Sequence, residues 1–481
     1  MKKAVWIFLL IMTASAAAAG SIFVLNFEDS SIYAPIGIIG AGLLITFLFR
    51  PFWGYLFFTL TLPLQSEEYA LLEFGGAVIR VADVIALPVF LGWIFSACFI
   101  KKEGLPLRKT GFELPLLLFS SFVVLSILWS TDLPSSISKL LQLIYAIILF
   151  YMSSDLIKTK KDLILVFWAW LLAGTFLAGT TVYDSLASSA RGASDFAANS
   201  LVTGELLNYP SFLGIGFILA LRGIWPRVTA FVLTAACASA LIATGSRGPI
   251  LGFAGAILYI VLASPSLRKP LRLLPSLGVA ALVVFAAWAV VLNVGVIELA
   301  QDSMARFIQL IEDPMSDTGV RYRVALWSAA WELFVRFPII GIGIGSLTDR
   351  LTKYVPVELG HPTVLHCLYL EMLLLLGFLG FLVFAWLFIR MAKFLWQTRR
   401  EVGDPSLKDL LRGVIAALIA QGIGWLTYGK FIENRVFWVC LALAVAISRL
   451  APEPRQAEHV PHFLLDTGDN ILLEAGGDRG R

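Results

Sequence analysis

Residues 295–366 decide how this chain folds, and they read GVIELAQDSMARFIQLIEDPMSDTGVRYRVALWSAAWELFVRFPIIGIGIGSLTDRLTKYVPVELGHPTVLH. They form the longest interval without a run apolar enough to cross a membrane, whereas nearly everything before them and two segments after them are hydrophobic enough to do so. Cations gather in this interval, at Arg306, Arg321, Arg323, Arg336, Arg350 and Lys353. The pattern predicts a membrane-embedded scaffold that carries one large polar loop.

The composition is that of a polytopic membrane protein. Apolar residues make up 58% of the chain and charged residues only 15%, whereas a soluble domain carries about a quarter charged residues. The four cysteines are scattered, so the sequence predicts neither a disulfide framework nor a Cys/His metal site. No nucleic-acid partner is expected.

Hydrophobic runs predict an all-α protein with about 12–14 transmembrane helices, since each span needs about 20 mainly apolar residues. The candidate spans lie near 4–25, 33–49, 51–65, 81–100, 113–129, 136–154, 162–182, 207–223, 228–245, 249–265, 274–294, 364–390, 409–428 and 434–450. The third is short enough to be re-entrant or interfacial. The first also resembles a secretory signal peptide, because Lys2 and Lys3 precede it. Its apolar character continues to Leu25, so we expect an uncleaved anchor.

The distribution of Lys and Arg predicts the orientation of these spans, because cytoplasmic loops are enriched in both. With both termini in the cytoplasm, most cations fall on the inner side and the 295–363 loop lies outside. The sequence therefore divides into an N-terminal bundle (1–294), this outer loop (295–363), C-terminal spans (364–450) and a polar cytoplasmic tail (451–481). The expected location is a bacterial inner membrane, with the polar loop facing the periplasm or the cell exterior.

A short turn, Thr244-Gly245-Ser246-Arg247-Gly248-Pro249, interrupts an apolar run on the same outer side. Glycine and proline break the helix there and hold Arg247 at the membrane surface. An ionisable residue so close to hydrocarbon is a candidate functional residue. A snorkelling loop arginine that only marks the interface is the competing interpretation.

An amphipathic helix is predicted to begin near Thr318-Gly319-Val320-Arg321-Tyr322-Arg323, because apolar side chains then recur at helical spacing up to Val335. A plain interfacial helix anchored by Arg321 and Arg323 would give the same pattern. The Gly341-Ile-Gly343-Ile-Gly345 run that follows lacks the strand–loop–helix context of a nucleotide site. We therefore expect it to permit close backbone packing.

Two titratable residues stand at the start of the span near 364. His366 lies at its outer end, where a histidine can act as a general base near neutral pH. Glu371 lies deeper, where an acid needs a partner or a polar cavity. A structural histidine remains the alternative.

The arginine turn, the amphipathic helix and His366 all fall on one membrane face. Such a convergence is typical of a site for an anion embedded in lipid, and arginine suits phosphate oxygens through paired hydrogen bonds. A diphosphate on a lipid carrier, approached from the outer leaflet, fits better than a soluble anion.

These residues resemble the O-antigen ligase and polymerase superfamily of bacterial envelope glycosyltransferases, which have a multi-spanning, GT-C-like fold. Ser246-Arg247-Gly248 is similar to the family's Ser-Arg-Gly turn. Arg323-Val-Ala-Leu-Trp327, followed by Pro338 and Gly341-Ile-Gly343, resembles its R-x-x-x-W and P-x-x-G-x-G patterns. The third similarity is His366 followed by Gly377 and Gly380, with Cys367 standing where the family has an amide or hydroxyl residue.

The resemblance implies an inverting transfer that uses no metal and no cofactor. Arg247 and Arg323 would hold the diphosphate of an undecaprenyl-diphosphate-linked glycan, and His366 would deprotonate the acceptor hydroxyl. Arg321, Ser246 and Glu371 are further candidates for substrate contact. The acceptor would be lipid A–core for a ligase or the growing polysaccharide for a polymerase, and Cys367 shifts the balance toward the polymerase.

Two other classes of function stay open. A transporter or flippase for an anionic or lipid-linked solute would place its binding groups near the midplane, often in two repeated halves, and this chain shows no repeat. A structural partner in an envelope assembly complex would tolerate replacement of Arg247 and His366.

Overall fold

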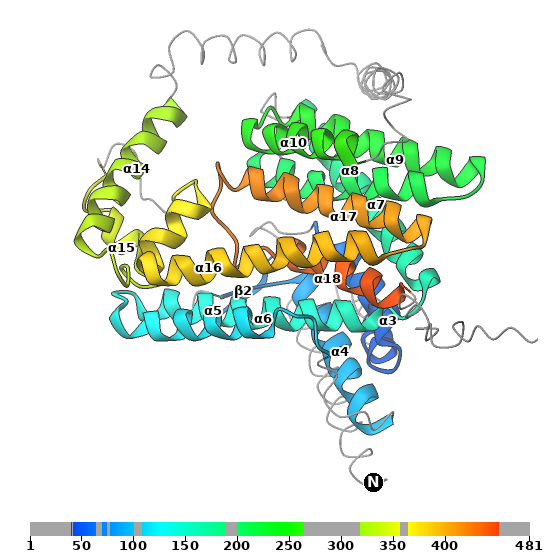
Figure 1. The fold of residues 1–481 in the computed structure, drawn as a ribbon, viewed down its shortest axis with the longest axis horizontal. Helices are drawn as coiled ribbons and strands as arrows, with labels where there is room; N and C mark the ends of the chain where they lie inside the picture. The colour runs from blue at the N-terminus through cyan, green and yellow to red at the C-terminus, as the bar shows by residue number, and fades with distance from the viewer. Residues whose placement is uncertain are drawn as a thin grey trace, which may run out of the picture.

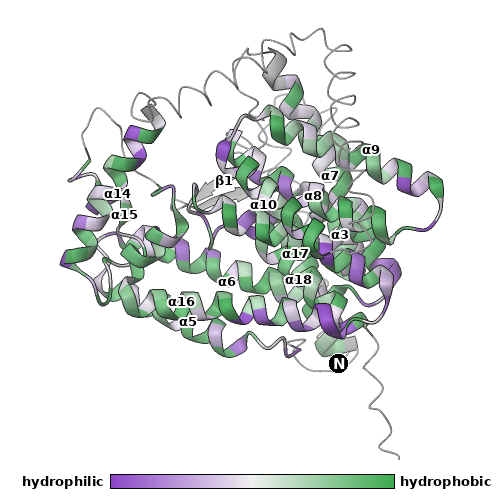
Figure 2. Ribbon diagram, turned by 45° about the horizontal axis from the view of Figure 1, so that its top comes forward, coloured by the Kyte–Doolittle hydropathy of each residue, from purple (hydrophilic) through white to green (hydrophobic). Residues whose placement is uncertain are grey.

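The computed structural model describes residues 40, 42–63, 70–74, 77–100, 108–187, 200–263, 318–355 and 364–451. Within them the chain forms a bundle of long helices, and α14 and α15 lie at one end of that bundle (Figure 1). Hydrophobic residues dominate the helices, while hydrophilic residues gather mainly at helix ends and connections (Figure 2). The prediction of an all-α polytopic membrane protein is confirmed.

The described elements follow one another with short connections. In the N-terminal part they are α3 (Pro51–Thr61), the hairpin β1 (Ala70–Phe74) and β2 (Ala77–Arg80), α4 (Val81–Phe95) with the π-helical η2 (Ser96–Ile100), α5 (Glu113–Ser126) with the 3-10 turn η3 (Ile127–Trp129), α6 (Leu133–Leu156), α7 (Lys160–Ala187), α8 (Ser200–Ala220), α9 (Ile224–Ala243) and α10 (Arg247–Ala263). The later elements are α14 (Thr318–Arg336), α15 (Leu347–Leu351), α16 (Leu368–Glu401), α17 (Pro405–Gly424) and α18 (Arg435–Leu450).

Each candidate span between 51 and 265, and each between 364 and 450, coincides with one of these helices. Among the described residues, five helices are long and apolar enough to cross a membrane, namely Val81–Phe99, Leu133–Leu156, Lys160–Tyr183, Ile224–Ala243 and Leu368–Glu401. The spans predicted near 4–25 and 274–294 lie outside the described residues, as does the tail beyond 451 and most of the span near 33–49. The short antiparallel hairpin between α3 and α4 is an addition to the predicted helices.

Helix α8 forms the centre of the bundle and packs against α7, α9 and α17. Residues 203–214 of α8 are all buried. Gly216 meets Gly413 of α17 so closely that a Cβ at position 216 would lie 2.8 Å from the Gly413 Cα. Small residues allow such close backbone contact between membrane helices. This contact places the ends of α8 and α17 beside each other.

Helix α16 is broken at Gly377, which has φ +66° and ψ −173°. The glycine run after α14 fills the break, since the amides of Ile342 and Gly343 each donate to α16 carbonyls over 3.0 Å, and Phe378 N donates to Pro338 O over 2.8 Å. A Cβ at Gly341 would overlap the backbone of Gly377. The expectation that the glycine run permits close backbone packing is therefore confirmed.

Candidate active site

The Arg247 turn joins α9 to α10 and is fastened to α8. Gly245 takes the left-handed conformation, with φ +60°, and the buried Thr244 hydroxyl accepts a hydrogen bond from Ser246 N over 3.3 Å. The Asn208 side-chain amide of α8 donates to the Pro249 carbonyl over 3.1 Å. Arg247 is the first residue of α10, so its guanidinium starts from the positive end of a helix dipole.

The same turn lies directly against Thr427, in the segment that follows α17. A Cβ at Gly248 would overlap the Thr427 hydroxyl, so only glycine permits this approach. The segment itself is fixed, because Thr427 N and Oγ1 each donate to the Gly424 carbonyl over 2.9 Å. The end of α17 therefore forms the floor beneath the Arg247 turn.

His366 stands on the turn that precedes α16. Its φ of +54° is the only left-handed conformation of a non-glycine residue within the described part of the chain. The peptide before it is held on both sides: Trp327 Nε1 of α14 donates to Leu365 O over 3.0 Å, and Leu365 N donates to Glu371 Oε2 over 3.2 Å. The Tyr322 ring lies 6.0 Å, and the Tyr428 ring 6.5 Å, from the imidazole ring. The histidine is thus placed by three separate helices.

The surroundings of His366 favour its neutral form. Burial of the side chain lowers the pKa of His366, and the nearby positive charge of Arg323 lowers it further, while a hydrogen bond to the Thr427 backbone opposes both. The Nδ1 atom is buried and has no hydrogen-bond partner among the residues that the structure describes. A neutral imidazole with an unused lone pair can accept a proton.

The structure therefore brings together Arg323, His366 and the Arg247 turn, with Thr427 in contact with both turns. Glu371 is also close, but it is 2% exposed and faces the backbone of the His366 turn. Arg321 is exposed, whereas Arg323 is half-buried. Ser246 is half-buried within the turn that carries Arg247.

Sequence analysis missed the segment between α17 and α18. Thr427 and Tyr428 contact His366, and two residues further on Lys430 places its ammonium 6.0 Å from the Tyr428 ring. Further along, Glu433 accepts an ion pair from Lys139 of α6 over 2.9 Å. Charged residues between two spans on the outer side were the only signal in the sequence that could have identified it.

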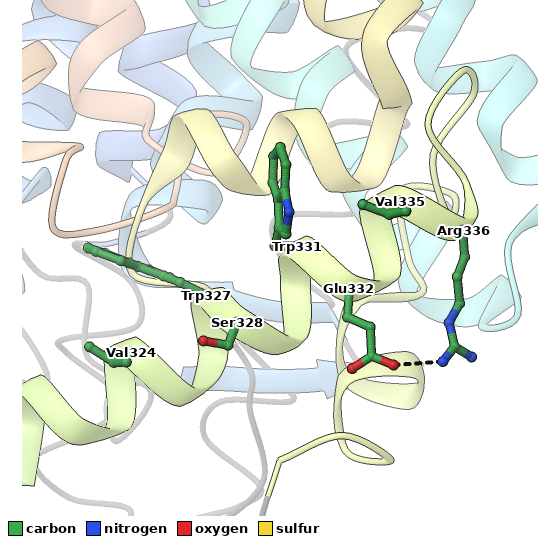
Figure 3. A pocket seen from close by; sticks show the side chains of 7 residues that line it. All are labelled: Val324, Trp327, Ser328, Trp331, Glu332, Val335 and Arg336. Atoms are coloured by element: carbon green, nitrogen blue, oxygen red, sulfur yellow. Dashed lines mark hydrogen bonds and ion pairs between the residues drawn. The ribbon is translucent and has the colours of Figure 1, made fainter.

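An open groove of about 680 Å³ runs along α14. Its apolar side chains are Val324, Trp327, Trp331 and Val335, and the Glu332–Arg336 ion pair lies beside them (Figure 3). Trp331 is 57% exposed. Arg323 directly precedes Val324, so the groove begins beside the cation that acts on His366. Within the described residues no group of three or more His, Cys, Asp or Glu side chains is placed to hold a metal ion.

Comparison with known proteins gives consistent results. Residues 229–385 match the sequence model of the O-antigen ligase family, an interval that includes Arg247, Arg323 and His366. The chain is 25% identical over 359 residues to the teichuronic acid biosynthesis protein TuaE of Bacillus subtilis, an alignment that covers 69% of this chain and 71% of that protein. It is 24% identical over 350 residues to an O-antigen ligase of Pseudomonas aeruginosa, covering 71% and 79% of the two chains.

Proposed function

Since residues 229–385 place this chain in the O-antigen ligase superfamily, we propose that it is a membrane glycosyltransferase that moves a glycan from an undecaprenyl-diphosphate carrier to a hydroxyl of an acceptor sugar. The observation that carries the proposal is the convergence of Arg323, His366 and the Arg247 turn around Thr427. Two cations and one proton acceptor at a membrane surface match what this transfer requires.

Arg247 and Arg323 bind the diphosphate of the donor. Guanidinium groups form paired, charge-assisted hydrogen bonds with phosphate oxygens, and the first turn of α10 adds its dipole to Arg247. The apolar groove on α14 receives hydrocarbon of the carrier beside Arg323. The same cations stabilise the negative charge that develops as the diphosphate leaves. They supply the positive charge that a metal ion supplies in other transferases, so the proposed reaction is metal-independent.

His366 acts as the general base. The acceptor hydroxyl gives its proton to Nδ1, its oxygen forms a bond to the anomeric carbon, and the bond from that carbon to the diphosphate oxygen breaks. The electron pair of the broken bond leaves on the diphosphate. Attack from the face opposite the leaving group inverts the anomeric carbon. The unpartnered, buried Nδ1 and the lowered pKa of His366 support this role.

The site faces the periplasm or the cell exterior in this proposal, with both termini in the cytoplasm of a cell whose inner membrane holds the protein. The charge distribution of the spans supports that orientation. The acceptor is either lipid A–core or a growing polysaccharide. Both named relatives belong to the biosynthesis of envelope polysaccharides, one in teichuronic acid formation and one as an O-antigen ligase.

A transfer assay with purified protein in detergent tests the proposal. A polyprenyl-diphosphate oligosaccharide is supplied with and without lipid A–core, and products are separated by gel and identified by mass spectrometry. Glycan on the added acceptor identifies a ligase, and lengthened lipid-linked glycan identifies a polymerase. A folded wild type that yields neither product with several donors contradicts the proposal, and transport of the same donors into proteoliposomes is then the experiment to make.

A further inference from the structure

A cluster of charged residues lies behind the His366 turn, outside the proposed catalytic set. Its members are Glu371 of α16, Lys139 of α6, and Lys430 and Glu433 of the segment between α17 and α18. Lys139 and Glu433 form an ion pair of 2.9 Å with side chains that are 20% and 25% exposed. The charges of Lys139, Lys430 and Glu433 all act on Glu371, which is itself buried. Buried charges persist when they are paired and hydrogen-bonded.

The Glu371 carboxylate faces the backbone of the His366 turn and not the groove. Its Oε2 accepts the Leu365 amide over 3.2 Å. On another side it meets Gly429, where a Cβ would lie 2.5 Å from Oε2. The carboxylate therefore fills the space between the two segments that contact the imidazole, one of which carries His366 and the other Tyr428.

The His366 turn needs such support. A non-glycine residue with φ near +54° is in a sparsely populated conformation that persists only where the surroundings fix it. The Trp327 indole fixes the carbonyl of the preceding peptide, and the Leu368 amide donates to Trp425 O over 2.9 Å. Glu371 is the side chain that fixes the amide of Leu365. A carboxylate acceptor makes this hydrogen bond stronger than a neutral one would be.

We propose that Glu371 is a positioning residue: its carboxylate holds the Leu365–His366 peptide so that Nδ1 of His366 faces the acceptor hydroxyl, and the Lys139–Glu433 ion pair holds the carboxylate in place. The inference rests on the proposed function of His366 as general base. It assigns Glu371 to the backbone of the catalytic turn, where sequence analysis had considered substrate contact.

The test compares Glu371→Gln with Glu371→Met. The glutamine keeps a side-chain oxygen that accepts the Leu365 amide, whereas methionine has nearly the same size and no such acceptor. We expect Glu371→Met to lower kcat by about 100-fold, the scale of a misplaced catalytic group, with an unchanged KM for the donor. Glu371→Gln keeps kcat close to the wild-type value. In Glu371→Met the imidazole is less buried, so the acid limb of the kcat/KM profile moves to higher pH.

Asp155 provides the matched control, because it is 6% exposed and lies at the opposite end of α6 from Lys139. It accepts the Trp93 indole over 2.9 Å and has no contact with the His366 turn. Asp155→Asn and Asp155→Leu are expected to change thermal stability without moving the pH profile of transfer. A shift in the Asp155 variants equal to that in Glu371→Met overturns the proposal, because it shows a general effect of losing a buried acid.

Two further outcomes also overturn the inference. Glu371→Met with wild-type kcat shows that the hydrogen bond to Leu365 does not place the histidine. An equal loss in Glu371→Gln and Glu371→Met shows that the acceptor oxygen is not what matters. Both outcomes require an active wild type, so they leave the proposed function intact. A wild type without transfer activity contradicts the proposed function instead.

Discussion

At the scale of single residues, the electrostatic link between Arg323 and His366 is the most specific feature of the site. A positive charge beside an imidazole disfavours the imidazolium, and burial acts in the same direction, so the pKa of His366 lies below its ordinary value. A base that is neutral at lower pH remains active at lower pH. The site therefore gains activity on the acid side from an arginine that also suits the donor diphosphate.

Replacing Arg323 by glutamine is expected to raise the pKa of His366. The histidine is then unprotonated only at higher pH, so the acid limb of the kcat/KM profile shifts upward in pH, and donor binding weakens at every pH. The measurement is the pH profile of transfer for the wild type and Arg323→Gln. Arg336→Gln is the control, since that arginine lies at the other end of α14 and pairs with Glu332. An acid limb that stays in place in Arg323→Gln would show that its charge does not act on the base.

Cys367 occupies the N-cap position of α16, and its side chain makes no capping hydrogen bond. Asparagine and serine are strong N-caps, which gives a physical reason for the amide or hydroxyl residue that the family pattern has at this position. Cys367→Asn is expected to raise the free energy of unfolding by about 0.5–2 kcal/mol, measured by denaturation in detergent. Cys98→Asn, in the π-helical turn after α4, serves as a control that should not stabilise the protein. Equal or lower stability of Cys367→Asn would contradict the capping explanation.

The sequence identified Arg247, Arg323 and His366, because each lies beside a glycine, a proline or an amphipathic stripe. It could not identify Thr427. That residue contributes a backbone carbonyl to His366 and a hydroxyl packed against Gly248, and neither contact requires a characteristic residue type. Tyr428 was equally invisible, since an aromatic residue at the end of a span is ordinary in a membrane protein.

At the scale of elements, hydropathy located the spans but not all of their ends. Helix α8 begins at Ser200, before the predicted start at 207, because its buried Glu205 is accommodated by a hydrogen bond from Gln421 of α17 over 3.1 Å. Helix α16 continues to Glu401, past the predicted end at 390, through residues that are partly exposed and charged. Apolar content alone reports neither kind of extension.

The break in α16 shows another limit of sequence patterns. Glycine is frequent in membrane helices, so Gly377 alone does not reveal that it has φ +66°. Gly377→Ala is expected to lower the stability by about 1–3 kcal/mol, the cost of a residue in an unfavourable backbone conformation, and its Cβ would also overlap the Ile339 carbonyl. Gly403→Ala is the control, because its Cβ would have no atom within 4 Å. The two melting temperatures in detergent make the comparison, and an equally stable pair would contradict the described break.

At the scale of the whole molecule, the bundle brings together segments that are more than 100 residues apart along the chain. The turn at 247, the start of α14, the turn at 366 and the end of α17 meet in one region because α8, α17 and α10 pack closely. The sequence predicted that the first three share a membrane face, from the alternation of spans and charge. It could not predict contact between them, since that depends on which helices are neighbours.

The central claim is that the arginines hold the donor while the histidine performs the chemistry. Donor binding and transfer measured on the same purified samples test it most directly, using Arg247→Gln, Arg323→Gln and His366→Gln. We predict that each arginine variant weakens donor binding by about tenfold or more, since a hydrogen bond to a charged group contributes about 1.5–3 kcal/mol. His366→Gln should bind the donor as the wild type does and transfer at least about 100-fold more slowly. A His366→Gln protein that transfers glycan at the wild-type rate would contradict the account.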